Sequence, residues 1–543
     1  MHGLRLTTMN EVDEFLSKKQ YFQLGGLSTE SPNPLTMNLS QLAQNDLDAG
    51  LRIMRQIDLA ALRKTLAGFD DYQELFRAVA ETLEEGQRIY LVGCGATGRL
   101  SLSLEHLWRR RNPSSDQVRS LMAGGDVALV HSLEGFEDFP QFGARHLKQL
   151  GFANGDLVIA TTEGGETPYV IGAVELAALD SRRAPYFLYC NSRKTLIEKV
   201  ERSKRVLENP RIKSLCLEVG PMALSGSTRM QASTVLMLVV GLALEFGADW
   251  KRAERELRTW ICFLEKSQAP ALQGFILREA ETYREGNFTC YTAEELAITV
   301  FADTTERAPT FNLAPFDNPA HKTDRFSLTY ISIPSANTAL ESWQHLLGRD
   351  PRPLEWPEVH PKSSADYLLS FDFSRKARDF REQLLSGAKH FDFLIGLAGD
   401  HLCLRFRDNE EHFPISDQTA LFAHLTAKML LNMHSTLVFG RLGRFEGNLM
   451  TWLYPSNGKL VDRAARYTQI LLEQRGYSEF DYDSIVRAQF ACKADLSPEQ
   501  SIVHRTVERL IRGHAKESRH SPNGRDLFSY SVDRTGTAFG PPD

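Results

Sequence analysis

Residues 88–100 read RIYLVGCGATGRL, which joins a short apolar run to a glycine-rich loop and to the start of a helical pattern. The run 88–92 has the length of a buried strand, and leucines recur at helical spacing from Leu100 to Leu107. Glycines allow the backbone to approach a ligand, and the helix presents the positive end of its dipole at the same place. The segment therefore predicts a strand, a tight loop and a helix that together bind an anion, most often phosphate.

The loop 93–98 has two other interpretations. Its spelling fits the dinucleotide-binding pattern G-x-G-x-x-G, and a purely structural tight turn could carry the same glycines. A dinucleotide site calls for an acidic residue about 20 positions later, at the end of the next strand. Residues 112–115 instead read NPSS, and Asp126 is the next obvious acid at a strand end. Phosphate binding is therefore the favoured interpretation.

Short apolar runs alternate with helical patterns along most of the chain. Strands are expected in two series, at 88–92, 156–160, 185–190 and 214–219, and at 287–291, 326–333, 367–373 and 391–397. Helical spacing is clear at 46–83, at 421–441 and in one long segment from 229 to about 266. Strands that alternate with helices in this way predict the α/β class, with parallel sheets covered by helices on both faces.

The length of 543 residues exceeds what one hydrophobic core usually holds, so we expect more than one domain. The predicted division is an N-terminal arm at 1–45, a first α/β domain at 46–265, a second at 266–460, a C-terminal helical region at 461–512 and a flexible tail at 513–543.

Bulk properties exclude several classes of protein. The net charge of -6 argues against a nucleic-acid-binding surface, which normally needs a basic face. The seven cysteines are scattered without a CxxC pair, so we expect neither a disulfide framework nor a metal site, and no cofactor. The N-terminus lacks a secretory signal, and no apolar run reaches the roughly 20 residues that span a bilayer. We expect a cytoplasmic protein that binds neither nucleic acid nor membrane.

A second loop, SGSTR at 225–229, lies between an expected strand and the long helical segment. Its hydroxyls and its arginine could converge on phosphate, although a serine or threonine that caps the helix would look the same. Two anion-friendly helix starts in one parallel sheet favour a shared phosphate site. The expected site residues from these two loops are Gly93, Gly95, Ala96, Thr97, Ser225, Ser227, Thr228 and Arg229.

Several motifs occur in a recognisable order: GCGATGRL at 93–100, AGG at 123–125, EGFED at 134–138, TPYVIG at 167–172 and SGSTRM at 225–230. Together they resemble the sugar isomerase (SIS) domains of the group formed by N-acetylmuramic acid 6-phosphate etherase and the glucokinase regulatory protein. Further matches to the same group are TESPNP at 29–34, KMLLNMHST at 428–436, GNLM at 447–450 and SNGKL at 456–460. The resemblance implies two SIS domains of flavodoxin-like, three-layer αβα, parallel-sheet architecture, followed by a helical region.

The resemblance also implies a composite site. The catalytic glutamate of the etherase helix falls on Leu107, and Glu105 points elsewhere on the same helix. The second series carries the motif DTTERAPTF at 303–311, which places a glutamate at Glu306, while its loop at 292–297 reads TAEELA and is too acidic to hold phosphate. We therefore expect the first domain to hold phosphate and the second to lend Glu306, unless Glu306 is a plain surface acid.

Four further positions carry expectations from the same resemblance. Glu137 matches a glutamate that acts in proton transfer or contacts the sugar. Lys428 matches a lysine that contacts the sugar phosphate, with a solvated lysine as the alternative. Gly164, followed by Gly165, stands where the family has a serine. This loss, the nearby Glu163 and Glu166 and the replacement of a lysine by Gln231 predict either weaker phosphate binding or a less highly charged ligand.

Two functions follow from the resemblance. The first is a sugar-phosphate sensor similar to the glucokinase regulatory protein, which binds a phosphorylated hexose or amino sugar and, by analogy only, a sugar kinase. The second is an enzyme, either an etherase that removes lactate from a muramic acid phosphate or an aldose–ketose isomerase. In an enzyme, Glu137 and Glu306 would be the catalytic residues. The two-domain arrangement and the altered motifs favour the sensor.

Overall fold

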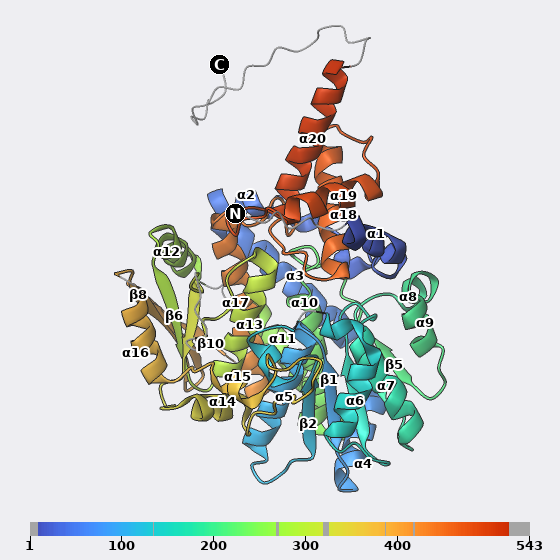
Figure 1. Ribbon diagram of the computed structural model, residues 1–543. Coiled ribbons are helices and arrows are strands. Elements are labelled where there is room, and N and C mark those ends of the chain that lie inside the picture. Colours follow the sequence, from blue (N-terminus) through green and yellow to red (C-terminus); the bar gives the residue numbers. More distant parts are fainter. Residues whose placement is uncertain are drawn as a thin grey trace.

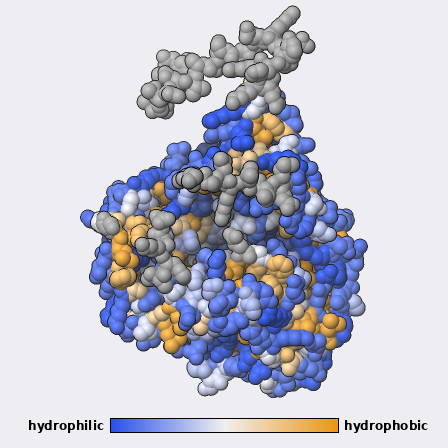
Figure 2. Space-filling view, in the orientation of Figure 1, coloured by the Kyte–Doolittle hydropathy of each residue, from blue (hydrophilic) through white to orange (hydrophobic). Residues whose placement is uncertain are grey.

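The computed structural model describes residues 9–133, 135–267, 271–318, 325–385, 387–415 and 419–520, and Figure 1 shows two α/β units side by side beneath a group of helices. Glu134 and most of the predicted tail lie outside these residues. The chain's surface in Figure 2 is mostly hydrophilic, with small apolar patches between. In the described part of the chain, no helix combines the length and the apolar character needed to cross a membrane.

The first sheet is parallel throughout. Its strands lie in the order β2-β1-β3-β4-β5 and comprise β1 (Ile89–Gly93), β2 (Val118–Met122), β3 (Leu157–Thr161), β4 (Tyr186–Tyr189) and β5 (Lys213–Cys216). Both faces are covered, because Ile89 and Leu91 pack in one apolar cluster and Tyr90 and Val92 in another. This is the flavodoxin-like strand order that the resemblance implied.

Helices cover the two faces of this sheet (Figure 1). The arm and first domain contain α1 (Met9–Lys18), α2 (Leu39–Asn45), α3 (Leu47–Ala67), α4 (Gln73–Glu84), α5 (Ala96–Arg111), α6 (Pro140–Gln149), α7 (Pro168–Asp180), α8 (Arg193–Lys199), α9 (Glu201–Leu207), α10 (Gln231–Phe246) and α11 (Trp250–Lys266). The single long helix expected at 229–266 is wrong. Gly247, with φ of 53°, ends α10, and the Asp249 side chain accepts the backbone N–H of Arg252 to start α11.

The second sheet has the same strand order but a mixed direction. Its strands, in the order β7-β6-β8-β9-β10, comprise β6 (Phe288–Ala293), β7 (Thr329–Ser332), β8 (His390–Ala398), β9 (His401–Phe406) and β10 (Asn409–Pro414). β6, β7 and β8 are parallel, whereas β9 and β10 are antiparallel. Only Gly399-Asp400 and Arg407-Asp408 link these last strands, and such short links cannot return the chain for a parallel pairing. The sequence did not predict β2, β9 or β10.

One strand expected in the second domain is wrong. The segment 367–373 is not a strand, because α15 (Ala365–Leu369) begins where the Ser364 side chain accepts the Tyr367 N–H. Phe371 and Phe373 are buried beyond this helix. The other helices of this domain are α12 (Gln273–Arg284), α13 (Ala297–Phe311), α14 (Ala339–Leu347) and α16 (Arg375–Leu384).

One helix, α17 (Ala420–Arg441), contacts both α/β domains. It packs against α10 of the first domain and against α12 and α13 of the second, so it is buried on nearly every side. The helical region above it consists of α18 (Gly458–Gln474), α19 (Tyr482–Lys493) and α20 (Ile502–His520), with α1 beside them (Figure 1). α20 continues past residue 513, where the tail was expected to begin.

A buried ion-pair cluster fastens the two domains. Arg349, which follows α14, contacts Asp126 at 2.6 Å and Glu105 at 3.1 Å, and Arg352 contacts Glu105 at 2.9 Å. Burial alone would raise the pKa of Glu105, but Arg349, Arg352 and Arg109 outweigh it and hold that pKa well below its usual range. Glu105 is thus engaged in joining the domains.

Replacing Arg349 tests this cluster. Arg349→Ala removes the positive charge that pairs with the buried carboxylates of Glu105 and Asp126. We therefore expect the free energy of unfolding to fall by about 3–5 kcal/mol in urea titrations at pH 7. The matched control is Arg258→Ala, because Arg258 pairs with Glu254 on the surface and its loss should cost less than about 1 kcal/mol. Equal effects of the two substitutions would contradict the role assigned to Arg349.

Candidate functional site

The loop between β1 and α5 is braced from within. Thr97 Oγ1 accepts the Cys94 N–H at 3.0 Å and donates to the Cys94 carbonyl at 2.9 Å. The Thr97 hydroxyl, expected to face a ligand, therefore holds the loop closed on itself. In the first helical turn the N–H groups of Thr97 and Arg99 already donate to the carbonyls of Cys94 and Gly95, so the other N–H groups of this turn are the anion donors that remain.

Two glycines of the loop are required by close packing. A Cβ on Gly93 would lie 2.3 Å from the Thr97 carbonyl, and one on Gly98 would lie 2.4 Å from Met122 Cγ in β2. Gly95 adopts φ of 55°, and a Cβ there would meet nothing within 4 Å. The loop therefore packs tightly against its own domain and is open in front of Gly95.

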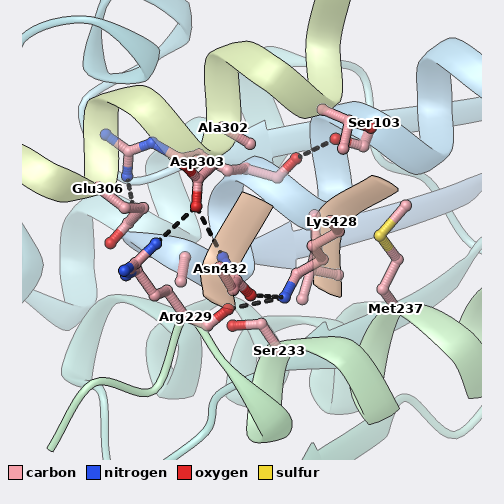
Figure 3. Close-up of a pocket in the computed structure, with 13 residues that line it drawn as sticks. Ser103, Arg229, Ser233, Met237, Ala302, Asp303, Glu306, Lys428 and Asn432 are labelled. Carbon is pink, nitrogen blue, oxygen red and sulfur yellow. Dashed lines mark hydrogen bonds and ion pairs between the residues drawn. The ribbon is translucent and has the colours of Figure 1, made fainter. Parts of the chain in front are cut away.

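Glu306 comes to this loop from the other domain. α13 packs against α5, and Arg99 in the first turns of α5 donates from Nη1 to Glu306 Oε1 at 2.5 Å and from Nε to Thr305 Oγ1 at 2.8 Å. Ala96 and Glu306 line one cavity between the domains, shown in Figure 3. The structure thus brings together the two halves of the expected composite site.

The cavity beside Glu306 is small and rich in ion pairs. Arg229 contacts Asp303 at 2.6 Å, and Asn432 also donates to Asp303 (Figure 3). The cavity volume is about 30 Å³, whereas ligand sites usually measure about 300–1,000 Å³. A ligand of hexose size would therefore fit this cavity only after side chains such as Arg99, or the two domains, move apart.

Lys428 lines the same cavity, but its ammonium group already donates to oxygens of the protein. Its Nζ donates to the Arg229 carbonyl at 2.7 Å, to Thr234 Oγ1 at 2.9 Å and to Asn432 Oδ1 at 3.1 Å. Burial lowers the pKa of Lys428 to about 8. Lys428 therefore holds the start of α10 against α17, and a phosphate would have to displace one of these acceptors to contact it.

Glu137 reaches the same loop from another side. Its Oε1 accepts from Asn457 Nδ2 at 2.8 Å and its Oε2 accepts from Cys94 Sγ at 3.1 Å. Glu137 lines a second cavity of about 340 Å³ together with Glu166 and Lys459. The structure therefore places Glu137 and Glu306 on two different cavities, and each lies near the loop 93–98, since Ala96 lines the cavity of Glu306 and Cys94 contacts Glu137.

The second predicted loop contributes two unused hydroxyls. Ser225 Oγ and Ser227 Oγ are buried and have no hydrogen-bond partner among the described residues. None of the loop's side chains caps α10, whose N-cap is Met230, so the alternative helix-cap interpretation does not describe this loop. Arg229 lines the cavity beside Glu306, but its guanidinium is engaged by Asp303, Ser435 and Thr436. The hydroxyls of Ser225 and Ser227 are thus the side-chain donors of this loop that remain available to bind an anion.

The loop after β3 carries two acids in different states. Glu166 contacts Arg202 at 2.5 Å and Lys459 at 3.0 Å, and these cations outweigh burial and lower its pKa to about 2. Glu163 is 7% exposed and accepts from Ser233 Oγ at 3.2 Å. Burial raises the pKa of Glu163 to about 7.

The neighbouring glycines keep the loop after β3 in place. Gly164 accepts from Asn191 Nδ2 at 3.1 Å. Gly165 has φ of 79°, and a Cβ there would lie 2.6 Å from Leu196 Cδ1. These two residues shape the loop through its backbone.

The sequence did not identify three residues of this region: Arg99, Asn457 and Lys459. All three lie within the motifs GCGATGRL and SNGKL, but the spacing of these motifs does not show which residues they contact. The arm contacts the first domain, where the Thr29 N–H donates to Asn191 Oδ1, and it also contacts α18, where Glu30 is buried against Arg463 at 2.6 Å. These contacts bring the arm, the first domain and α18 together.

In the second domain, the loop at 292–297 corresponds to the glycine loop of the first domain. The carboxylate of Glu294, which belongs to this loop, fills it. Glu294 accepts from the Ser335 N–H at 2.6 Å and from Ser335 Oγ at 2.8 Å. An internal carboxylate thus uses donors that could otherwise serve a bound anion. This arrangement agrees with the expectation that this acidic loop is a poor phosphate cradle.

The fold and the loop at the carboxyl ends of its strands define an α/β ligand-binding protein. The family model for the glucokinase regulatory protein N-terminal SIS domain matches residues 73–178. N-acetylmuramic acid 6-phosphate etherase 1 of Bacillus licheniformis is 30% identical over 220 residues, which is 40% of this chain and 67% of that protein. The etherase of Rippkaea orientalis is 32% identical over 224 residues, 41% of this chain and 68% of that protein. The chain therefore belongs to the SIS-domain family of the N-acetylmuramic acid 6-phosphate etherases.

A solved structure gives a weaker match. Tagatose-6-phosphate ketose/aldose isomerase from Escherichia coli superimposes with a TM-score of 0.42 at 12% identity, covering 77% of this chain and 97% of that one.

Replacing Gly93 tests the packing of the loop. The Cβ of Gly93→Ala would overlap the Thr97 carbonyl, so we expect a loss of about 1–3 kcal/mol in the free energy of unfolding, measured by denaturant titration. Gly396→Ala is the matched control, because a Cβ at Gly396 meets nothing within 4 Å. A Gly93→Ala protein as stable as the control would show that the loop does not need this glycine.

Proposed function

We propose that the chain binds a phosphorylated amino sugar at the loop 93–98 and cleaves an ether bond of that sugar, as the name of its etherase relatives describes. The observation that carries this proposal is the position of Glu306, which the second domain lends to the loop of the first. Glu137 touches the same loop through Cys94. Two carboxylates therefore flank the place where phosphate would be held.

These two carboxylates suit an ether cleavage. One can take a proton from the sugar while the other gives a proton to the departing ether oxygen, and water then supplies the new hydroxyl. The C–O bond breaks, one C–O bond to water forms, and no oxidant or reductant is needed. Because Arg99 is paired with Glu306 in the structure, binding of substrate must separate this pair before Glu306 acts.

A sugar-phosphate sensor is the second candidate, and the same ion pair favours it. A carboxylate tied to Arg99 can recognise a sugar hydroxyl without transferring a proton, and a ligand that opens this pair would change how the domains meet. The match to the regulatory-protein model supports this alternative. A sugar kinase is then the partner by analogy, and the cytoplasm is the proposed location for either function.

Lactate release distinguishes the two functions. Incubation with N-acetylmuramic acid 6-phosphate should release lactate, and Glu137→Gln or Glu306→Gln should lower the rate by at least about 100-fold, the usual contribution of a general acid or base. Glu295→Gln is the matched control, since Glu295 is exposed in the acidic loop of the second domain, and it should leave the rate unchanged.

Absence of lactate would contradict the etherase. In that case a rise in melting temperature with the same sugar phosphate would support the sensor, because a ligand that binds only the folded state stabilises it.

A further inference from the structure

The cations around the loop 93–98 are already matched by carboxylates. The pairs that contact one another are Arg99 with Glu306, Arg229 with Asp303, Lys459 with Glu166 and Arg463 with Glu30. Lys428 touches neutral oxygens instead. A phosphate that arrives with two negative charges therefore enters a region whose positive charges are largely balanced.

Glu163 is a buried acid that lies one hydrogen bond away from the cavity beside Glu306. It follows β3 at the carboxyl edge of the sheet, and its side chain turns toward Ser233 in the first turn of α10. Ser233 lines the same cavity as Ala96 of the loop and Glu306. Within the described residues no cation lies within ion-pair distance of the Glu163 carboxyl, in contrast to its neighbour Glu166.

Charged and titratable groups face Glu163 from each surrounding element. They are Cys94 in the loop before α5, Cys190 after β4, Glu306 on α13 and Lys459 on α18. Lys459 is the cation of this set, and it is in contact with Glu166. The surroundings of Glu163 therefore offer little to stabilise its anion, and Glu306 adds repulsion.

An ionised Glu163 beside a phosphate dianion would place like charges together in a buried site. Such pairs repel strongly because little water screens them. A protonated carboxyl, in contrast, has an O–H that can donate to a phosphoryl oxygen. The two protonation states of Glu163 therefore have opposite effects on binding: the ionised carboxylate repels phosphate, and the neutral carboxyl binds it.

We propose that Glu163 binds the phosphate of the ligand in its neutral form, so that each phosphate is taken up together with one proton from solvent. This inference rests on the proposed phosphosugar site and names the residue that sets which ligand charge the site accepts. Burial also raises the pKa of Glu163 to about 7, so the carboxyl changes state near neutral pH. Affinity should then fall as the pH rises above 7, because the empty site must regain the proton before phosphate binds.

The test measures binding of N-acetylglucosamine 6-phosphate, an amino-sugar phosphate without an ether to cleave, by calorimetry at pH 6.5 and 8.5. For uptake of one proton with a pKa of about 7, the dissociation constant of the wild type should rise about 25-fold between these pH values, beyond any change in the control variant. Titrations at pH 8.5 in buffers of different ionisation enthalpy should show the uptake of about one proton.

Glu163→Gln is the decisive variant, because its amide keeps the shape and a donor but cannot ionise. It should lose the 25-fold difference and bind at least about tenfold more tightly than the wild type at pH 8.5. Glu166→Gln is the matched control, since Glu166 stays ionised across this range, and it should keep the wild-type pH dependence.

Three outcomes would overturn the inference. Equal pH dependence in the wild type and Glu163→Gln, or no proton uptake by the wild type, would overturn the role of Glu163 while leaving the phosphosugar site intact. The proton measurement needs no variant, so it decides even if Glu163→Gln fails to fold. No binding by the wild type at either pH would overturn the phosphosugar site together with this inference.

Discussion

The ion pair between Arg99 and Glu306 is the contact on which the site depends. Arg99 stands at the start of the helix that leaves the glycine loop, and Glu306 stands on the facing helix of the other domain. Both side chains are largely buried, so removing either partner would leave a charge without water or a counterion. The pair therefore holds α5 against α13 and sets the distance between the loop and the acid that the second domain supplies.

The two domains share a strand order but have taken different roles. The first keeps five parallel strands and a glycine loop whose Ala96 lines the cavity between the domains. The second replaces two crossover connections by two-residue links, so its last strands turn antiparallel. Its own loop is filled by Glu294, which binds Ser335. One domain thus retains a place for an anion, and the other has become its support and the source of Glu306.

Balanced charge is the common property of the buried polar groups. Glu105 and Asp126 with Arg349, Asp303 with Arg229, and Glu30 with Arg463 each fasten segments that are far apart in the chain. Such pairs add specificity to the docking of the domains, because a shifted packing would strand their charges. They also leave the loop with few free cations, which explains why a single unpaired acid such as Glu163 matters for the ligand.

The sequence by itself determined the local features: strand, glycine loop and helix at 88–111, the parallel first sheet and the acidic loop at 292–297. These features follow from apolar spacing and from backbone geometry that only glycine permits, as at Gly93, and both act over a few residues. The short links at 399–400 and 407–408 and the break at Gly247 left too weak a signal. Only the tertiary structure decided that Arg99 contacts Glu306, 207 residues away, and that Thr97 and Lys428 donate their hydrogen bonds to oxygens of the protein itself. Such contacts depend on how helices pack across domains, which no local pattern of residues records.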